Sequence, residues 1–202
     1  GKQLAPLLSK DHKVTIIGSK DVDITDRECV FDFFAKNDFE VVINFSALNH
    51  DSFLHKLDMT KTEQVMSQLD VNILGNVNVL SACLPMMRKN NFGRIIGASS
   101  ILSSQPLPGT SLYSASKSFI ETLYKTAALE NSSKNITCNT LQLGYFDGGL
   151  AHKIPEVVRN KIVENIPAKR MGSIVELHSA ISFLINVQYI NGSVLKINGG
   201  LD

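Results

Sequence analysis

Short apolar runs alternate with longer amphipathic stretches along this chain of 202 residues. Runs rich in β-branched residues predict strands at Val14–Ile17, Val41–Phe45, Arg94–Ala98, Thr137–Leu143 and Ser193–Ile197. Apolar side chains three to four residues apart predict helices at Gly1–Leu8, Asp26–Lys36, Thr62–Lys89, Ser111–Glu130 and Val175–Ile185. Strands that alternate with helices in this way are typical of an α/β fold.

The predicted strands are short and carry few charges, which indicates burial on both faces of a sheet. We therefore expect a single domain over residues 1–202, with a doubly wound, mostly parallel sheet of the Rossmann type. In such sheets the ligand lies beyond the carboxyl ends of the strands. Three residues stand at or just after a predicted strand end and are the first candidates for a site: Asn44, Ser100 and Gly144.

Composition narrows the possible partners. Charged residues make up 19% of the chain and the net charge is +1, which argues against a nucleic-acid partner. No uninterrupted apolar run reaches the roughly 18 residues that span a membrane, so we expect no membrane partner. The cysteines Cys29, Cys83 and Cys138 are widely spaced, without metal-ligand spacing, so we expect no metal. Free thiols favour a reducing compartment and hence a cytoplasmic location.

Tyr113 and Lys117 form the most distinctive pair in the chain. They lie four residues apart at the start of a predicted helix, so both project from one face, one turn apart. A free tyrosine has a pKa near 10, and a nearby ammonium lowers that pKa by stabilising the phenolate. Such a pair can transfer protons, but the spacing alone also fits an exposed tyrosine beside a solvated lysine. Ser100, at a strand end thirteen residues earlier, adds a third polar group.

Several further segments stand in register with this pair, and together they resemble the short-chain dehydrogenase/reductase family of the 3-oxoacyl-carrier-protein reductase type. The segments are Val71-Asn-Ile-Leu-Gly75, Gly93-Arg-Ile-Ile96, Ala98-Ser-Ser100, Leu112-Tyr-Ser-Ala-Ser-Lys117, Asn135-Ile-Thr-Cys-Asn139, Pro167-Ala-Lys-Arg-Met-Gly172 and Tyr189–Gly200. The resemblance implies an NAD(P)-dependent oxidoreductase that transfers a hydride between the nicotinamide and a small carbonyl or alcohol substrate.

The resemblance also implies catalytic roles for four residues. Tyr113 would act as the general acid/base that protonates the substrate oxygen, and Ser100 would orient and polarise the carbonyl. Lys117 would lower the pKa of Tyr113 and hydrogen-bond the nicotinamide ribose. Asn72 would hold a water that links Lys117 to solvent.

The cofactor side departs from the family pattern. Phe45-Ser46-Ala47 stands where the family has Asn-Ala-Gly, and Gly148 stands where a threonine is usual. The resemblance assigns cofactor contacts to Gly1, Ser19, Lys20, Asp23, Asn44, Phe45, Ser46, Ala47, Tyr113, Lys117, Gly144 and Phe146. An acid at the position of Ser19 or Lys20 would favour NAD, so Lys20 favours NADP over NAD; alternatively it is a solvated loop charge.

The N-terminus and the region after Gly144 complete the expectations. Gly1 aligns with the last glycine of the family's phosphate-binding turn, so we expect the first strand to be missing from the given chain. Residues 148–165 are expected to form a substrate lid. The resemblance implies a homodimer or homotetramer built on the two long helices. Two alternatives remain: a non-catalytic binding or scaffold protein on the same fold, and a sugar-nucleotide reductase.

Overall fold

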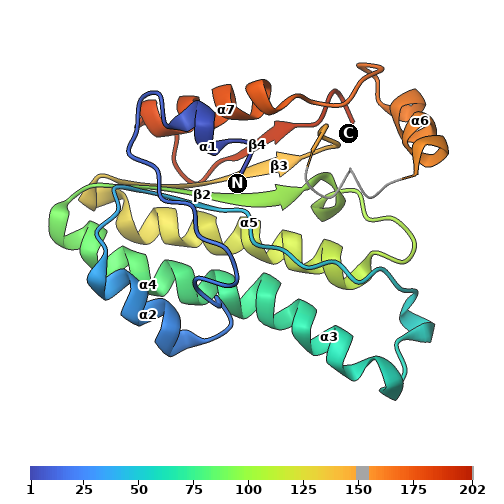
Figure 1. The fold of residues 1–202 in the computed structure, drawn as a ribbon, viewed down its shortest axis with the longest axis horizontal. Coiled ribbons are helices and arrows are strands. Elements are labelled where there is room, and N and C mark those ends of the chain that lie inside the picture. The colour runs from blue at the N-terminus through green and yellow to red at the C-terminus, as the bar shows by residue number, and fades with distance from the viewer. Residues whose placement is uncertain (149–154, 202) are drawn as a thin grey trace.

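A four-stranded parallel sheet forms the centre of the computed structural model, which describes residues 1–148 and 155–201. The strands are β1 (Val41–Asn44), β2 (Gly93–Ser100), β3 (Ile136–Leu143) and β4 (Val194–Ile197), side by side in chain order. Because every pair is parallel, all four carboxyl ends lie at the same edge of the sheet (Figure 1). The predicted α/β fold is confirmed.

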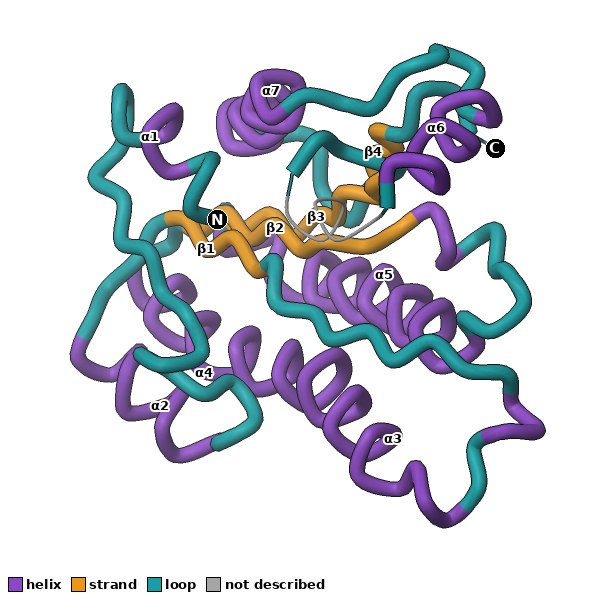
Figure 2. Tube along the Cα trace, turned by 45° about the vertical axis from the view of Figure 1, so that its right-hand side comes forward, coloured by secondary structure: helices purple, strands orange, loops and turns teal. Residues whose placement is uncertain are grey.

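Helices cover both faces of the sheet, as the doubly wound fold requires (Figure 2). One face carries α2 (Arg27–Lys36), α3 (Thr62–Leu69), α4 (Gly75–Asn90) and α5 (Ser111–Asn131), and the other carries α1 (Ala5–Leu8) and α7 (Ile174–Asn186). Each layer has its own apolar core, because β2 and β3 turn alternate side chains to opposite faces. Ile95 packs with the α4 and α5 cluster, whereas Ile96 packs with the α1 and α7 cluster.

The predicted long helix Thr62–Lys89 is continuous but not uniform. A π-helical turn, Asp70–Leu74, joins α3 to α4 and holds Asn72 at its centre. Extra-residue turns of this kind occur frequently at functional sites. The 32-residue stretch Met59–Asn90 is long and apolar enough to cross a membrane, by length and composition only. A core helix can have the same length and composition, and this one packs against α2 and α5.

The first predicted strand, Val14–Ile17, is wrong. These residues adopt no regular secondary structure, and Ile16 and Ile17 are 52% and 40% exposed. A strand requires a backbone ladder as well as β-branched residues. In the described part of the chain β1 pairs only with β2, and no strand pairs with Val14–Ile17.

The predicted lid, residues 148–165, lies partly outside the described residues, since 149–154 are not described. Its later part forms the helix α6 (Glu156–Asn165), which lies beyond the carboxyl ends of the central strands (Figure 1). Arg159 of this helix forms an ion pair with Asp147, with 2.8 Å between Nη2 and Oδ1. The helix therefore lies over the edge of the sheet where the candidate site residues gather.

Candidate active site

Tyr113, Lys117 and Ser100 meet at the carboxyl end of β2. Ser100 is the last residue of that strand, and α5 brings Tyr113 and Lys117 to it in its first two turns. The Ser100 hydroxyl lies close enough to the Tyr113 phenol to lower the pKa of the phenol. The Lys117 Nζ lies 5.4 Å from the centre of the Tyr113 ring. The structure thus brings together three of the four residues predicted to be catalytic.

Lys117 is a buried ammonium group, with only 2% of the residue exposed. Burial penalises the charged form and lowers the pKa of this lysine to about 8. Its Nζ donates a hydrogen bond to the backbone carbonyl of Ala98 on β2, at 2.7 Å. An ammonium carries three hydrogens, and in the described part of the chain Ala98 O is its only hydrogen-bond acceptor. Two donors are left for another group at the site.

The pKa of Tyr113 is raised, which differs from the predicted lowering by Lys117. Burial disfavours the phenolate and is the main cause; the hydrogen bond from Ser100 opposes it, and the negative charge of Asp51 adds to it. The Lys117 Nζ donates to Ala98 O rather than to the phenol in this structure. Tyr113 is therefore a protonated hydroxyl at neutral pH, in a state to donate rather than to accept a proton.

Asn72 is fully buried and its amide contacts backbone and side chain on two sides. Its Nδ2 donates to Leu48 O at 2.8 Å and to Ser116 Oγ at 3.0 Å, and its Oδ1 accepts from Leu48 N at 2.8 Å. The side chain thereby ties the segment after β1 to α5, next to Tyr113. The predicted water relay stays a prediction, and both Nδ2 hydrogens already have partners.

Two more amides on the same helix face extend this contact, and the sequence analysis missed them. Gln68 Oε1 accepts from His50 N at 2.7 Å, and Asn76 Oδ1 accepts from Asn44 Nδ2 at 3.0 Å. Gln68, Asn72 and Asn76 stand one turn apart and hold the segment from Asn44 to His50 along the helix. Their spacing of four within an apolar helix was a visible signal in the sequence.

Two of the predicted cofactor residues at the end of β1, Asn44 and Phe45, have side chains that contact the interior of the protein. The Asn44 amide bonds Asn76 and accepts from Ser46 N at 2.9 Å, so it shapes the turn. Phe45 packs with the apolar cluster beneath α7, while Ala47 is partly buried. A cofactor contact from this segment would therefore come from its backbone, which Asn44 holds in place.

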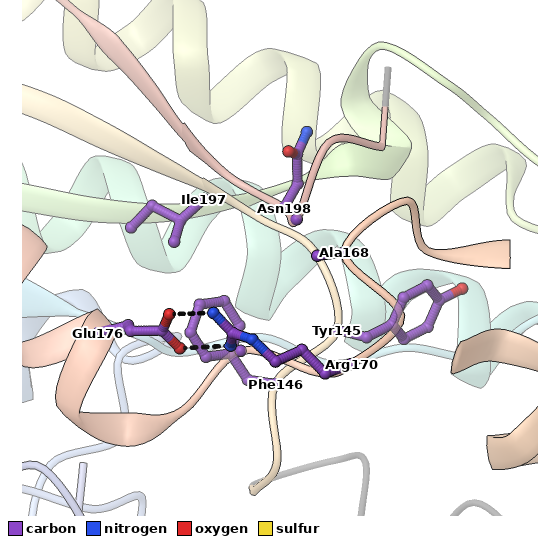
Figure 3. Close-up of a pocket in the computed structure, with 9 residues that line it drawn as sticks. Tyr145, Phe146, Ala168, Arg170, Glu176, Ile197 and Asn198 are labelled. Carbon is purple, nitrogen blue, oxygen red and sulfur yellow. Dashed lines mark hydrogen bonds and ion pairs between the residues drawn. The ribbon is translucent and has the colours of Figure 1, made fainter. Parts of the chain in front are cut away.

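The predicted cofactor residues after β3 pack against the end of the sheet. A Cβ on Gly144 would lie 2.7 Å from Asn198 Cα, so only glycine allows this approach. The Phe146 ring packs on Gly172, and Figure 3 shows it behind the Arg170–Glu176 ion pair. Phe146, Gly172 and the ion pair line a cavity of about 60 Å³, and Tyr113, Ser100 and Lys117 are not among its lining residues. That cavity is separate from the candidate catalytic residues.

The residues predicted to contact the adenosine half lie on exposed loops. Ser19 and Lys20 are exposed, and the Asp23 carboxylate accepts from Thr25 N at 2.9 Å, a contact that also lowers the pKa of Asp23. The Gly1 carbonyl accepts from two backbone amides at the start of α1. Across residues 1–148 and 155–201, no group of three His, Cys, Asp or Glu residues could hold a metal ion. The roles of these four residues stay predictions.

A parallel α/β sheet with a tyrosine, a lysine and a serine gathered at its carboxyl edge defines a class, that of nicotinamide-dependent oxidoreductases. The comparison with known proteins specifies the family. A family model described as Enoyl-(Acyl carrier protein) reductase matches residues 2–202. The chain belongs to the short-chain dehydrogenase/reductase family and is an NAD(P)-dependent oxidoreductase.

Individual relatives agree with this placement. The 3-oxoacyl-[acyl-carrier-protein] reductase MabA of Mycobacterium bovis is 30% identical over 186 residues, which cover 89% of this chain and 74% of MabA. The 3-oxoacyl-[acyl-carrier-protein] reductase FabG of Thermotoga maritima is 29% identical over 187 residues, covering 89% and 75%. A crystal structure described as a betaketoacyl-ACP reductase matches the fold with a TM-score of 0.77 at 22% identity, covering 89% and 75%.

Proposed function

We propose that this enzyme reduces the ketone of a 3-oxoacyl substrate with NADPH, with Tyr113 as the proton donor. The observation that carries the proposal is the grouping of the Ser100 and Tyr113 hydroxyls beside the buried Lys117, at the carboxyl end of β2. A carbonyl oxygen beside these hydroxyls would meet two hydroxyl donors. The names of the relatives supply the substrate class.

Each of the three side chains has a separate role in the proposed reaction. The cofactor, when bound, supplies the hydride, and the protein supplies a proton and an oriented carbonyl. Tyr113, whose pKa is raised, holds its proton at neutral pH and gives it to the developing alkoxide. Ser100 donates a second hydrogen bond to the same oxygen and orients it. Lys117 stays close enough to stabilise the phenolate that Tyr113 becomes.

The donor set at this edge fits a nicotinamide ribose. Lys117 offers two further hydrogens from a site that water scarcely reaches, and a ribose hydroxyl is an acceptor of the right size. The Asn44 side chain fixes the backbone that follows it, so this backbone already has a defined conformation when a cofactor binds. On the adenosine side, the exposed Lys20 supports NADPH as the partner, through the 2′-phosphate.

Turnover with defined substrates tests this function. We expect NADPH to be oxidised with a 3-oxoacyl thioester, and kcat/KM to be about tenfold higher with NADPH than with NADH, the effect of one charge-assisted contact worth roughly 1.4 kcal/mol. A trans-2-enoyl thioester, which lacks the ketone, serves as the comparison. If NADPH were oxidised with the enoyl thioester but not with the 3-oxoacyl thioester, carbonyl reduction would be refuted. A higher kcat/KM with NADH than with NADPH would refute the role of Lys20.

We further propose that two chains pair through the exposed face of α3 and α4. We also propose a cytoplasmic location, because the free cysteines of the protein favour a reducing compartment. Met66 and Leu74 are 50% and 52% exposed on this face although they are large apolar residues. We expect light scattering to give a dimer or tetramer at micromolar concentration, and the double change Met66→Glu and Leu74→Glu to give a monomer. Val158→Glu, on the 47% exposed Val158 of α6, is the control. A monomeric wild type would contradict the proposal.

A further inference from the structure

Glu121 on α5 accepts hydrogen bonds from side chains of three other elements. It lies one turn beyond Lys117, so Tyr113, Lys117 and Glu121 follow one another at a spacing of four residues. Its Oε1 accepts from Ser99 Oγ at 2.5 Å, from Ser103 Oγ at 2.6 Å and from Gln142 Nε2 at 3.2 Å. We call these four residues the Glu121 network. Its members come from β2, the 3₁₀ turn after it, β3 and α5.

Two members of the network flank Ser100 in the sequence. Ser99 precedes it, and Ser103 ends the 3₁₀ turn Ile101–Ser103 that Ser100 caps through a hydrogen bond from Leu102 N to its Oγ at 3.2 Å. The Ser103 hydroxyl also lies 2.8 Å from the Ser100 carbonyl. Whatever holds Ser99 and Ser103 therefore sets the place of Ser100.

The strength of these contacts points to Glu121 as the anchor. Hydroxyl-to-carboxylate bonds of 2.5–2.6 Å are the short, charge-assisted kind, roughly twice as strong as neutral ones. Ser99 and Gln142 are each 3% exposed, so water competes little for the hydroxyl and amide donors. Gln142 Nε2 also donates to Ser103 Oγ at 3.0 Å, which closes the network on itself.

The helix that carries the proton donor is thus fastened to the turn that carries its partner. Ser118, on the same helix, donates from Oγ to Ser103 O at 2.8 Å and adds a second fastening. Without the carboxylate, Ser99 and Ser103 would lose their shared acceptor, and the Ser99 hydroxyl would keep only its longer contact with the Lys117 carbonyl, at 3.4 Å.

We propose that Glu121 is a positioning residue, whose carboxylate fixes Ser100 at the place from which Ser100 and Tyr113 both reach the substrate oxygen. The inference rests on the proposed carbonyl reduction. Neither the substrate nor the cofactor needs to touch Glu121 for it to act in this way.

Turnover of three variants tests the role. We expect Glu121→Ala to lower kcat about tenfold to a hundredfold with little change in the KM for NADPH, since a displacement of about 1 Å can cost a hundredfold. Glu121→Gln keeps an oxygen acceptor at the same place and should restore most of kcat. Glu130→Ala, an exposed residue on the same helix, is the control. Equal kcat for Glu121→Ala and the control would overturn the proposal, as would a loss in Glu121→Gln as deep as in Glu121→Ala.

A second measurement does not depend on turnover. In protein labelled with ¹³C at tyrosine Cζ, Tyr113 is assigned by its loss in Tyr113→Phe and then titrated by NMR. The Ser100 hydrogen bond lowers the pKa of Tyr113, so Glu121→Ala and Ser100→Ala should both raise it, whereas Glu130→Ala should not. If the wild type has no turnover, the proposed function fails, but this titration still tests the role of Glu121. An unchanged pKa of Tyr113 in Glu121→Ala would refute the positioning role of Glu121.

Discussion

Tyr113→Phe is expected to lower kcat for carbonyl reduction about 10²–10⁴-fold, the usual contribution of a general acid, while NADPH still binds. The substitution removes one hydroxyl and keeps the ring whose face lies 5.4 Å from Lys117 Nζ. Because Tyr113 must be protonated to donate, the wild-type rate of reduction should fall as the pH rises past its raised pKa. Steady-state kinetics over a range of pH, with calorimetry for NADPH, measures both effects.

Tyr189→Phe is the matched control for this change. Tyr189 is fully exposed, so losing its hydroxyl should leave kcat and NADPH binding unchanged. If Tyr113→Phe kept wild-type turnover, Tyr113 would not be the proton donor and another acid would have to serve. If it lost NADPH binding along with turnover, the phenol would contribute to the cofactor site instead of acting only on the substrate.

The two central strands of the sheet could be predicted from the sequence because they are buried and therefore apolar. β2 and β3 are almost entirely buried, and their apolar runs mark them within two residues. Val14–Ile17 has the same composition and forms no strand, because pairing depends on a neighbour elsewhere in the chain. The local pattern thus shows which segments are able to form a strand, and pairing with a distant segment decides whether the strand forms.

The candidate site divides in a similar way. The spacing of Tyr113 and Lys117 on a helix, with Ser100 at the end of a strand, is visible in the sequence, and the three residues lie near one another in the structure. The bond from Lys117 to Ala98 is not visible, since it depends on how closely α5 packs on β2. The burial that raises the pKa of Tyr113 also depends on this packing, so the direction of the pKa shift required the structure.

Lys117→Met is expected to weaken NADPH binding about tenfold to a hundredfold, through the loss of a charged hydrogen-bond donor worth 1.5–3 kcal/mol, and to lower kcat further. Methionine fills a similar volume, so the core beneath α5 should be kept. Lys125→Met, at an exposed position on the same helix, is the control and should change neither quantity. Unaltered NADPH affinity in Lys117→Met would show that the ammonium does not contact the cofactor.

The difference in stability between the wild type and this variant should also depend on pH, in a defined direction. The pKa of Lys117 is about 8 in the folded protein, against an ordinary value of 10.5. Below pH 8 both states carry the proton; between these values the unfolded state binds more protons, so wild-type stability rises with pH relative to Lys117→Met. The gain should be about 2 kcal/mol from pH 8 to roughly pH 9.5, at 1.36 kcal/mol per pH unit. Urea unfolding of both proteins at the two pH values measures it, and a difference independent of pH would mean that the lysine stays charged in the fold.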